Sequence, residues 1–192
     1  MEDISLKFKN LYKRCSSEVF LSKKALGGEI PFYICAYNPK QELEVYAAIK
    51  LLMNKLETSG IEILELNLYD LSCEILESKG LMERMFKVEK SKSKEKFLRA
   101  LQSSLNIHEV LMPLINSKIQ KANAKIYFLT GIGQVYPFIR SHNVLNNLQN
   151  IAKEAPTLAF FPGEYNGHTL NLFSLLTDDN YYRAFNIEKI QV

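Results

Sequence analysis

The sequence has few of the residues that build metal sites, disulfide frameworks and membrane spans. Its 192 residues include three cysteines and three histidines, and no two cysteines form a C-x-x-C pair. We therefore expect no metal, no other cofactor, and reduced, buried thiols at Cys15, Cys35 and Cys73. No apolar run approaches the roughly 18 residues that cross a bilayer, and the first ten residues lack the apolar segment of a signal peptide. These absences predict a cytoplasmic protein that does not contact a membrane.

Motifs for nucleotide binding and for hydrolysis are incomplete. The segment TGIG (130–133) resembles the start of a phosphate loop, but it lacks the Lys that G-x-x-x-x-G-K-[ST] requires. The dinucleotide-binding fingerprint needs a third glycine where Tyr136 stands, and no G-x-S-x-G nucleophile motif occurs. We interpret TGIG as a turn and predict no catalytic residue.

Positive and negative charges are nearly balanced. The formal net charge is +3, which does not by itself indicate nucleic acid. The segment KVEKSKSKEK (87–96) concentrates five lysines, and we expect it to be a solvated, mobile connection. Binding of nucleic acid or phosphate there remains an alternative, although no aromatic residue is interleaved with the charge. The apolar fraction of 47% is enough for one globular domain over residues 1–192.

Strand-like and helix-like segments alternate along the chain. Expected strands cover 31–37, 61–68, 125–131, 157–163 and 183–190, and expected helices cover 4–14, 39–60, 70–79, 94–122 and 140–152. This order predicts an α/β fold with a mostly parallel, doubly wound sheet flanked by helices, Rossmann-like or NTPase-like but without a functional phosphate loop.

Capping residues and apolar spacing define the expected helices further. Asn38 is expected to cap the second helix with Gln41 as its capping-box partner, and Asp70 to cap the third. The long helical region is expected to break at NIHE (106–109) and to kink at Pro113. Turns are expected at 27–30 and at Asp178–Asp179. The predicted buried face of the second helix consists of Leu43, Ala47 or Ala48, Leu51 or Leu52, and Leu56.

Polar side chains crowd the helix that follows the third expected strand. Its buried stripe is expected to contain Val144, Leu145, Leu148, Ile151 and Ala152, which leaves the polar residues on the opposite face. The carboxyl ends of parallel strands meet at one edge of a sheet, where ligands and partners bind. The residues that we expect to bind a partner are Tyr136, Arg140, His142, Asn143, Asn146, Asn147, Glu164 and Tyr165. A solvated helix face with a structural cap explains the same polar run, and this alternative remains open.

Two further readings of the histidines are weaker. His142, Glu164 and His168 could be compared with a metal site, but their spacing matches no helical or knuckle motif. A hydrolase that uses His142 and Glu164 lacks a recognisable nucleophile motif. Both hypotheses rank below partner binding.

Several segments, in this order along the chain, resemble the BrxB family of BREX bacteriophage-defence systems. They are ICAYNPKQELEV (34–45), ELNLYDL (65–71), FLTGIGQVYPFIRSHNVLNNLQ (128–149), FFPGEY (160–165) and DDNYYRAFNI (178–187). The resemblance implies a bacterial cytoplasmic protein that acts beside a methyltransferase, a large ATPase and the alkaline-phosphatase-like protein PglZ. It implies no defined catalytic activity, so a non-enzymatic accessory subunit that binds PglZ is the leading hypothesis. The alternative is a nucleic-acid- or nucleotide-binding subunit of the same system.

Overall fold

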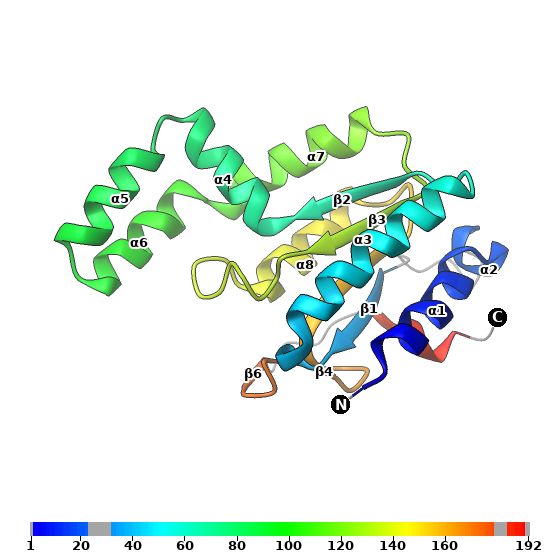
Figure 1. Ribbon diagram of the computed structural model, residues 1–192. Coiled ribbons are helices and arrows are strands. Elements are labelled where there is room, and N and C mark those ends of the chain that lie inside the picture. The colour runs from blue at the N-terminus through cyan, green and yellow to red at the C-terminus, as the bar shows by residue number, and fades with distance from the viewer. Residues whose placement is uncertain (1, 23–31, 179–183, 191–192) are drawn as a thin grey trace.

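The computed structural model describes residues 2–22, 32–178 and 184–190 (Figure 1). The helical elements are α1 (Ile4–Cys15), α2 (Glu18–Leu21), η2 (Pro39–Gln41), α3 (Glu42–Thr58), α4 (Leu68–Ser78), α5 (Met82–Ser91), α6 (Lys94–Ser104), η3 (Ile107–Leu111), α7 (Met112–Lys121), α8 (Ser141–Ile151) and η4 (Ile187–Lys189). The strands are β1 (Phe32–Tyr37), β2 (Ile63–Asn67), β3 (Ile126–Thr130), β4 (Thr157–Tyr165), β5 (Leu170–Leu172), β6 (Leu176–Asp178) and β7 (Phe185–Asn186). No described helix is both long and apolar enough to cross a membrane.

The sheet confirms the predicted mostly parallel α/β fold. Five strands pair in the order β2-β3-β4-β1-β7, and each of these pairings is parallel. The long strand β4 continues beyond this sheet and pairs antiparallel with β5, which pairs with β6. The hairpin β5–β6 was not predicted, and Asp178 ends β6 instead of forming a turn. The predicted last strand is confirmed only at Phe185–Asn186, while the expected turn at 27–30 and Asp179 lie outside the described residues.

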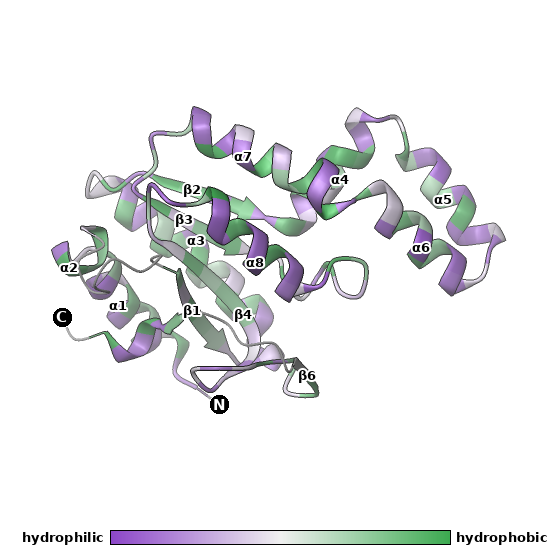
Figure 2. Cartoon of the chain, turned by 180° about the vertical axis from the view of Figure 1, so that it is seen from behind, coloured by the Kyte–Doolittle hydropathy of each residue, from purple (hydrophilic) through white to green (hydrophobic). Residues whose placement is uncertain are grey.

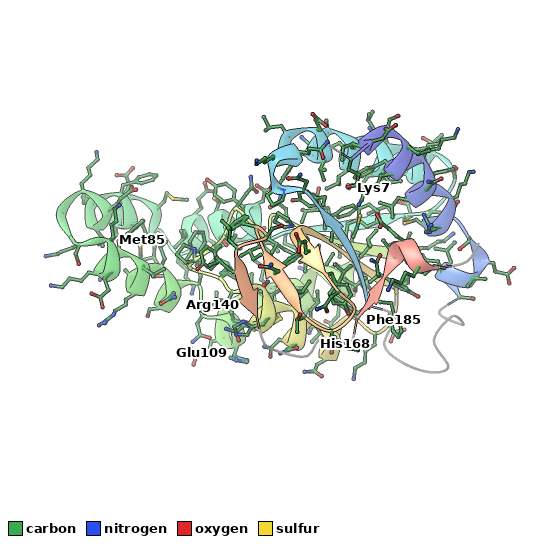
Figure 3. All side chains as sticks on the ribbon, turned by 90° about the horizontal axis from the view of Figure 1, so that it is seen from below. Lys7, Met85, Glu109, Arg140, His168 and Phe185 are labelled. Carbon is green, nitrogen blue, oxygen red and sulfur yellow. The ribbon has the colours of Figure 1, made fainter. Side chains whose placement is uncertain are left out.

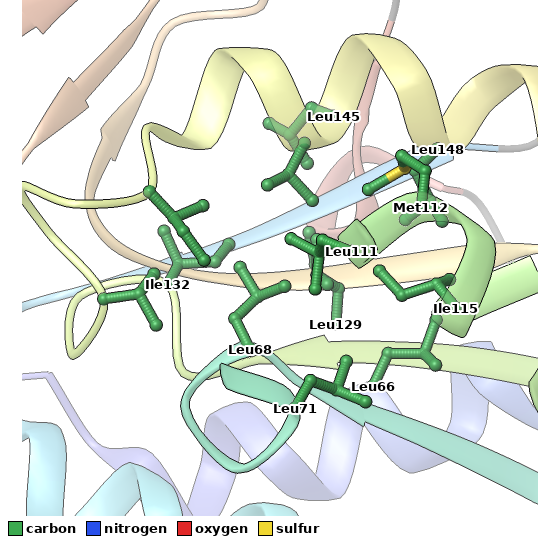
Figure 4. Packing of buried hydrophobic residues seen from close by; sticks show 14 of the residues in the cluster. Leu66, Leu68, Leu71, Leu111, Met112, Ile115, Leu129, Ile132, Leu145 and Leu148 are labelled. Atoms are coloured by element: carbon green, nitrogen blue, oxygen red, sulfur yellow. The ribbon is translucent and has the colours of Figure 1, made fainter. Parts of the chain in front are cut away.

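Helices cover both faces of the sheet, as the doubly wound prediction requires. Neighbouring residues of one strand point to opposite faces, so Phe160 belongs to the core beneath α1 and α3, and Phe161 to the core beneath α4, α7 and α8. Figure 4 shows the second core, in which leucines and isoleucines of β2, β3, α7 and α8 pack together. In the described part of the chain, both faces of the sheet are therefore covered by helices.

The predicted buried face of α3 is partly wrong. Leu43 is 86% exposed and Leu51 is 70% exposed. The buried stripe consists of Val45, Ile49, Leu52 and Leu56. Both sets repeat at helical spacing, and the structure shows that the one containing the β-branched residues faces the sheet.

The predicted cap Asn38 is confirmed, but its capping-box partner and the predicted cap of α4 are wrong. Asn38 accepts a hydrogen bond from the Lys40 amide, at 3.0 Å. The Gln41 side chain, however, does not bond the backbone amide of Asn38 as a capping box requires. The buried Gln41 side chain instead bonds the backbone of Glu2 and the carboxylate of Glu44. The cap of α4 is Asn67, which lies three residues before the predicted cap Asp70, and the helix begins at Leu68.

The lysine-rich segment is helical, so its assignment as a connection is wrong. Residues 87–91 complete α5, residues 94–96 begin α6, and only two residues separate the helices. The predicted break near 106–109 is confirmed by η3, whose cap Asn106 accepts from the amides of His108 and Glu109. Pro113 is the second residue of α7, which directly follows the π-helix η3, so the chain changes from π-helical to α-helical geometry next to this proline.

Cys15 and Cys35 are buried as predicted, whereas Cys73 is only half-buried. Burial raises the pKa of Cys35 to about 12 and raises that of Cys15 as well. Since the thiolate is the reactive species, we expect Cys73 alone to react readily with a thiol reagent in the folded protein at pH 8. Titration with Ellman's reagent should give one fast thiol natively and three in denaturant. A fast thiol that persists in Cys73→Ser would contradict this assignment.

Candidate functional site

The carboxyl ends of β1, β2, β3 and β4 lie at one edge of the sheet, as expected from their parallel pairing. The residues after β1 and β2 begin the helical elements η2 and α4, while β3 is followed by a long turn and β4 by the hairpin β5–β6. We call this region the strand-end edge. Ligands and partners of α/β proteins bind at this edge.

Asn67 organises the middle of the strand-end edge. Its side-chain oxygen accepts from the amides of Tyr69 at 3.0 Å and Asp70 at 3.3 Å, which caps α4. Its side-chain nitrogen donates to the Tyr46 hydroxyl at 3.0 Å, and that hydroxyl donates to Gln134 at 2.8 Å. These bonds join α3, β2, α4 and the turn after β3. The first amides of α4 are therefore occupied by the protein itself.

The turn after β3 packs directly against this cap. Gly131 has φ +73°, and a Cβ built there would lie 2.5 Å from the Asn67 side-chain oxygen. Only glycine allows this approach. The following residues Ile132, Val135 and Ile139 are buried in the core, and α8 does not begin until Ser141. The turn is thus folded onto the domain as part of its packing.

A groove lies beside the ends of β1 and β4, and we call it the β1–β4 groove. Its volume is 560 Å³. Its lining includes Asn38, Lys40, Glu164, Tyr165 and Phe173. Glu164 is exposed there, whereas Tyr165 is buried and its hydroxyl donates to the carbonyls of Gly167 and Ala184. Of these two predicted site residues, Glu164 is therefore the one with the more exposed side chain in the groove.

Two titratable groups that line the β1–β4 groove, Tyr37 and Lys7, are paired within the protein. Tyr37 donates to the Glu42 carboxylate at 2.8 Å, and burial together with this carboxylate raises the pKa of Tyr37. Lys7 is buried and bonds the Ala36 carbonyl at 2.7 Å, Glu2 at 2.8 Å and Glu188 at 2.6 Å. Burial lowers the pKa of Lys7, but the charges and hydrogen bonds around it raise that pKa by more. Tyr37 and Lys7 therefore remain protonated near neutral pH and hold the structure together.

Arg140 and Asn143 line a second groove, which we call the α8 groove. It has a volume of 330 Å³, and its other lining residues come from α6, η3 and the turn before α8. They are Gln102, Leu105, Asn106, Ile107, His108 and Phe138. Asn146 is exposed further along α8, and Asn147 donates to the Asn143 carbonyl at 2.7 Å. Figure 2 shows the hydrophilic residues along α8. Its predicted buried residues Val144, Leu145 and Leu148 are confirmed, whereas Ile151 is only half-buried.

Tyr136 lies on the turn that separates the two grooves. Its ring makes an edge contact with Phe173 of the hairpin, with centroids 6.1 Å apart, while Phe138 of the same turn lines the α8 groove. The predicted site residues therefore form two groups connected by this turn, and not one cluster. His142, which is half-buried, lines neither groove. Among the described residues, no three His, Cys, Asp or Glu side chains converge as they would around a metal ion.

Exposed apolar residues at the strand-end edge were not among the residues expected to bind a partner. Leu43 follows β1 at the start of α3, the half-exposed Tyr69 follows β2, and Leu175 in the β5–β6 turn is 81% exposed. The neighbouring Leu176 is also exposed. The pair of leucines in FSLLTDD (173–179), set between turn-forming residues, was the available signal.

Comparisons with known proteins give one consistent result. The family model described as BREX protein BrxB matches residues 64–187. A BREX protein BrxB of Bacillus cereus (strain H3081.97) is 37% identical over 191 residues, covering 97% of this chain and 98% of the relative. A BREX protein BrxB of Escherichia coli O9:H4 (strain HS) is 29% identical over 184 residues, covering 96% and 91%. No solved structure gives a significant match. The resemblance seen in the sequence is confirmed, and the chain belongs to the BrxB family of BREX proteins.

Proposed function

We propose that this BREX component is a non-enzymatic adaptor and that it binds a PglZ-type protein through the strand-end edge and the start of α8. The proposal rests on one observation, which is that backbone amides at the strand-end edge are already hydrogen-bonded within the protein. The amides that could hold a phosphate at the start of α4 are bonded to Asn67, and Gly131 is packed against the same side chain. Backbone amides at a helix start bind an anion only when they are free to do so.

The chemistry available along the edge also supports an adaptor. Tyr37 and Lys7 are held in their protonated forms by buried, bonded surroundings, so neither provides a base or a nucleophile. His142 and Glu164, the pair expected for a hydrolase, do not line a common groove among those described above.

The exposed residues favour a protein as the ligand. Leu43, Tyr69 and Leu175 present apolar side chains to solvent around a framework that is internally bonded. Exposed apolar groups on a rigid surface are typical of protein contacts, and Tyr and Arg are frequent anchors in them. Arg140, exposed at the rim of the α8 groove, supplies the charged part of such a contact.

Binding to purified PglZ tests both the partner and the surface. We expect Leu43→Ser/Leu175→Ser to weaken binding about tenfold or more, since each leucine would lose about 1 kcal/mol of contact energy or more. We expect Arg140→Ala/Asn147→Ala to weaken binding severalfold. The measurement is calorimetric titration of each variant against PglZ.

The matched control is Leu51→Ser. Leu51 is also a strongly exposed leucine of α3, but it lies two helical turns further along this helix than Leu43. It should bind as the unchanged protein does. Failure of the unchanged protein to bind PglZ would remove the proposed partner. Full binding by both folded double variants would place the contact elsewhere on the molecule.

A further inference from the structure

A helical hairpin made of α5 and α6, which we call the arm, projects from the domain. In Figures 1 and 2 the two helices lie beside each other and extend away from the sheet. The base of the arm is anchored, since Met85 is buried and Phe97 and Leu101 pack against the core beneath α4, α7 and α8. Met85 is the only buried residue in the two helices. The arm thus has a large surface that does not serve the fold.

This surface carries an excess of positive charge. Residues 82–104 include seven Lys or Arg and three Glu, a formal net charge of +4, whereas the whole chain has +3. Five of the positive charges are the lysines of 87–96, all exposed around the tip of the arm. Figure 3 shows side-chain nitrogens pointing outward from these helices. The net positive charge of the protein is therefore concentrated on one projecting element.

The arrangement does not stabilise the arm. Like charges close together on a helix are destabilising, and within the described part of the arm the one ion pair is Arg99 with Glu95. The tip lysines are not neutralised by carboxylates of the domain in any described ion pair. A charge concentration that costs stability and lies on a projecting surface is what binding to a polyanion requires.

We propose that the arm binds the phosphate backbone of double-stranded DNA without reading its sequence. The two observations that carry this are the five exposed lysines at the tip and the projection of the hairpin, which lets a duplex approach without touching the sheet. Lysine is a point charge suited to phosphate oxygens, and aromatic stacking is not needed on a paired duplex. This DNA binding is separate from docking at the strand-end edge, and it does not require PglZ.

Fluorescence anisotropy with a labelled 30-base-pair duplex and the full chain tests the proposal. We expect binding at 50 mM NaCl, with log K falling against log salt with a slope of about −4.5 if five lysines each release a counterion. The variant Lys87→Gln/Lys90→Gln/Lys92→Gln/Lys94→Gln should bind at least tenfold more weakly, with a slope of about −1. Glutamine has nearly the same helix propensity as lysine, so the arm should stay folded.

Two matched variants separate the arm from net charge and from misfolding. The first, Lys9→Gln/Lys13→Gln/Lys40→Gln/Lys50→Gln, removes the same charge from exposed positions on α1, η2 and α3, and it should bind within about twofold of the unchanged protein. The second replaces the four arm lysines by arginine, which keeps the charge, and it should bind at least as tightly as the unchanged protein. An absence of binding at 50 mM NaCl would overturn the proposal, as would equal losses in the two glutamine variants.

An acidic protein is the competing ligand for this surface. Labelled polyglutamate serves as its probe, and we expect it to be displaced by unlabelled duplex DNA at equal charge concentration. If polyglutamate instead displaces the duplex and shows the same dependence on the arm lysines, the arm is a protein-binding element and the proposal is wrong. Because PglZ is absent from these titrations, their outcome is independent of the proposed docking.

Discussion

Replacing Gly163 by alanine is expected to destabilise the protein by about 3 kcal/mol or more. Gly163 has φ +147°, and a Cβ at this position would lie 2.1 Å from the Asn171 carbonyl oxygen and 3.0 Å from the Phe173 amide. Both contacts are with backbone, which cannot rotate away as a side chain can. The substitution must therefore disrupt the pairing of Gly163 with Leu172, which joins β4 to β5.

The loss should also reach the proposed docking surface. The β5–β6 hairpin holds Leu175 at the strand-end edge, so displacement of β5 moves an expected contact residue. Chemical denaturation measures the free energy of unfolding, and titration against PglZ measures binding. Gly167→Ala is the control, because Gly167 also has a positive φ of +101° but nothing lies within 4 Å of its added Cβ. It should cost only about 1–2 kcal/mol of backbone strain, and an equal cost for the two substitutions would refute the argument from the clash.

Phe160→Ala is expected to cost about 3–5 kcal/mol, because it opens a cavity in the most central strand. The Phe160 ring packs 6.1 Å from that of Phe8 on α1 and 5.1 Å from that of Phe128 on β3. The strand β4 has β3 on one side and β1 on the other, so neither neighbour can move in without breaking its own pairing. For a protein of this size the melting temperature should fall by roughly 10 °C.

Phe86→Ala is the control for Phe160→Ala. Phe86 lies on the arm and is 49% exposed, so its removal leaves no enclosed cavity and should cost less than about 1 kcal/mol. Thermal unfolding followed by circular dichroism measures both variants. If Phe160→Ala melted as the Phe86 variant does, α1 would not depend on the sheet for its packing.

The order of elements and the parallel sheet could be predicted because they depend on local patterns. Strands such as 31–37 and 157–163 are apolar on both faces, as strands covered by helices on both sides are. Asn38 with Pro39 and the glycines at 60 and 80 mark the ends of helices in the way their backbone chemistry requires. The prediction that strand ends gather at one edge then followed from the fold class alone.

The errors arose where the local sequence pattern did not decide between two alternative structures. On α3 the sets containing Leu43 and Val45 have the same helical spacing, and only the position of the sheet selects between them. In 87–96 the lysines suggested a mobile connection, although lysine is a good helix former and a hairpin buries enough apolar surface at its base to order it. The strands β5 and β6 have three residues each, which is too short for an alternating pattern to be recognised.

The candidate site was predictable as a region but not in its internal arrangement. The two groups containing Arg140 and Glu164 are separated because the turn from Gly131 to Arg140 packs between the grooves. That packing depends on Asn67, which lies more than sixty residues earlier in the sequence. A contact between such distant residues leaves no local signal.

The arm leaves and rejoins the domain at neighbouring points. Lys79, just after α4, donates to the carbonyl of Ser104 at the end of α6, at 3.4 Å. A segment with adjoining ends can change in length or in charge without altering the order of the strands. Changes in the length or charge of the arm are therefore expected to leave the packing of the sheet and the strand-end edge intact.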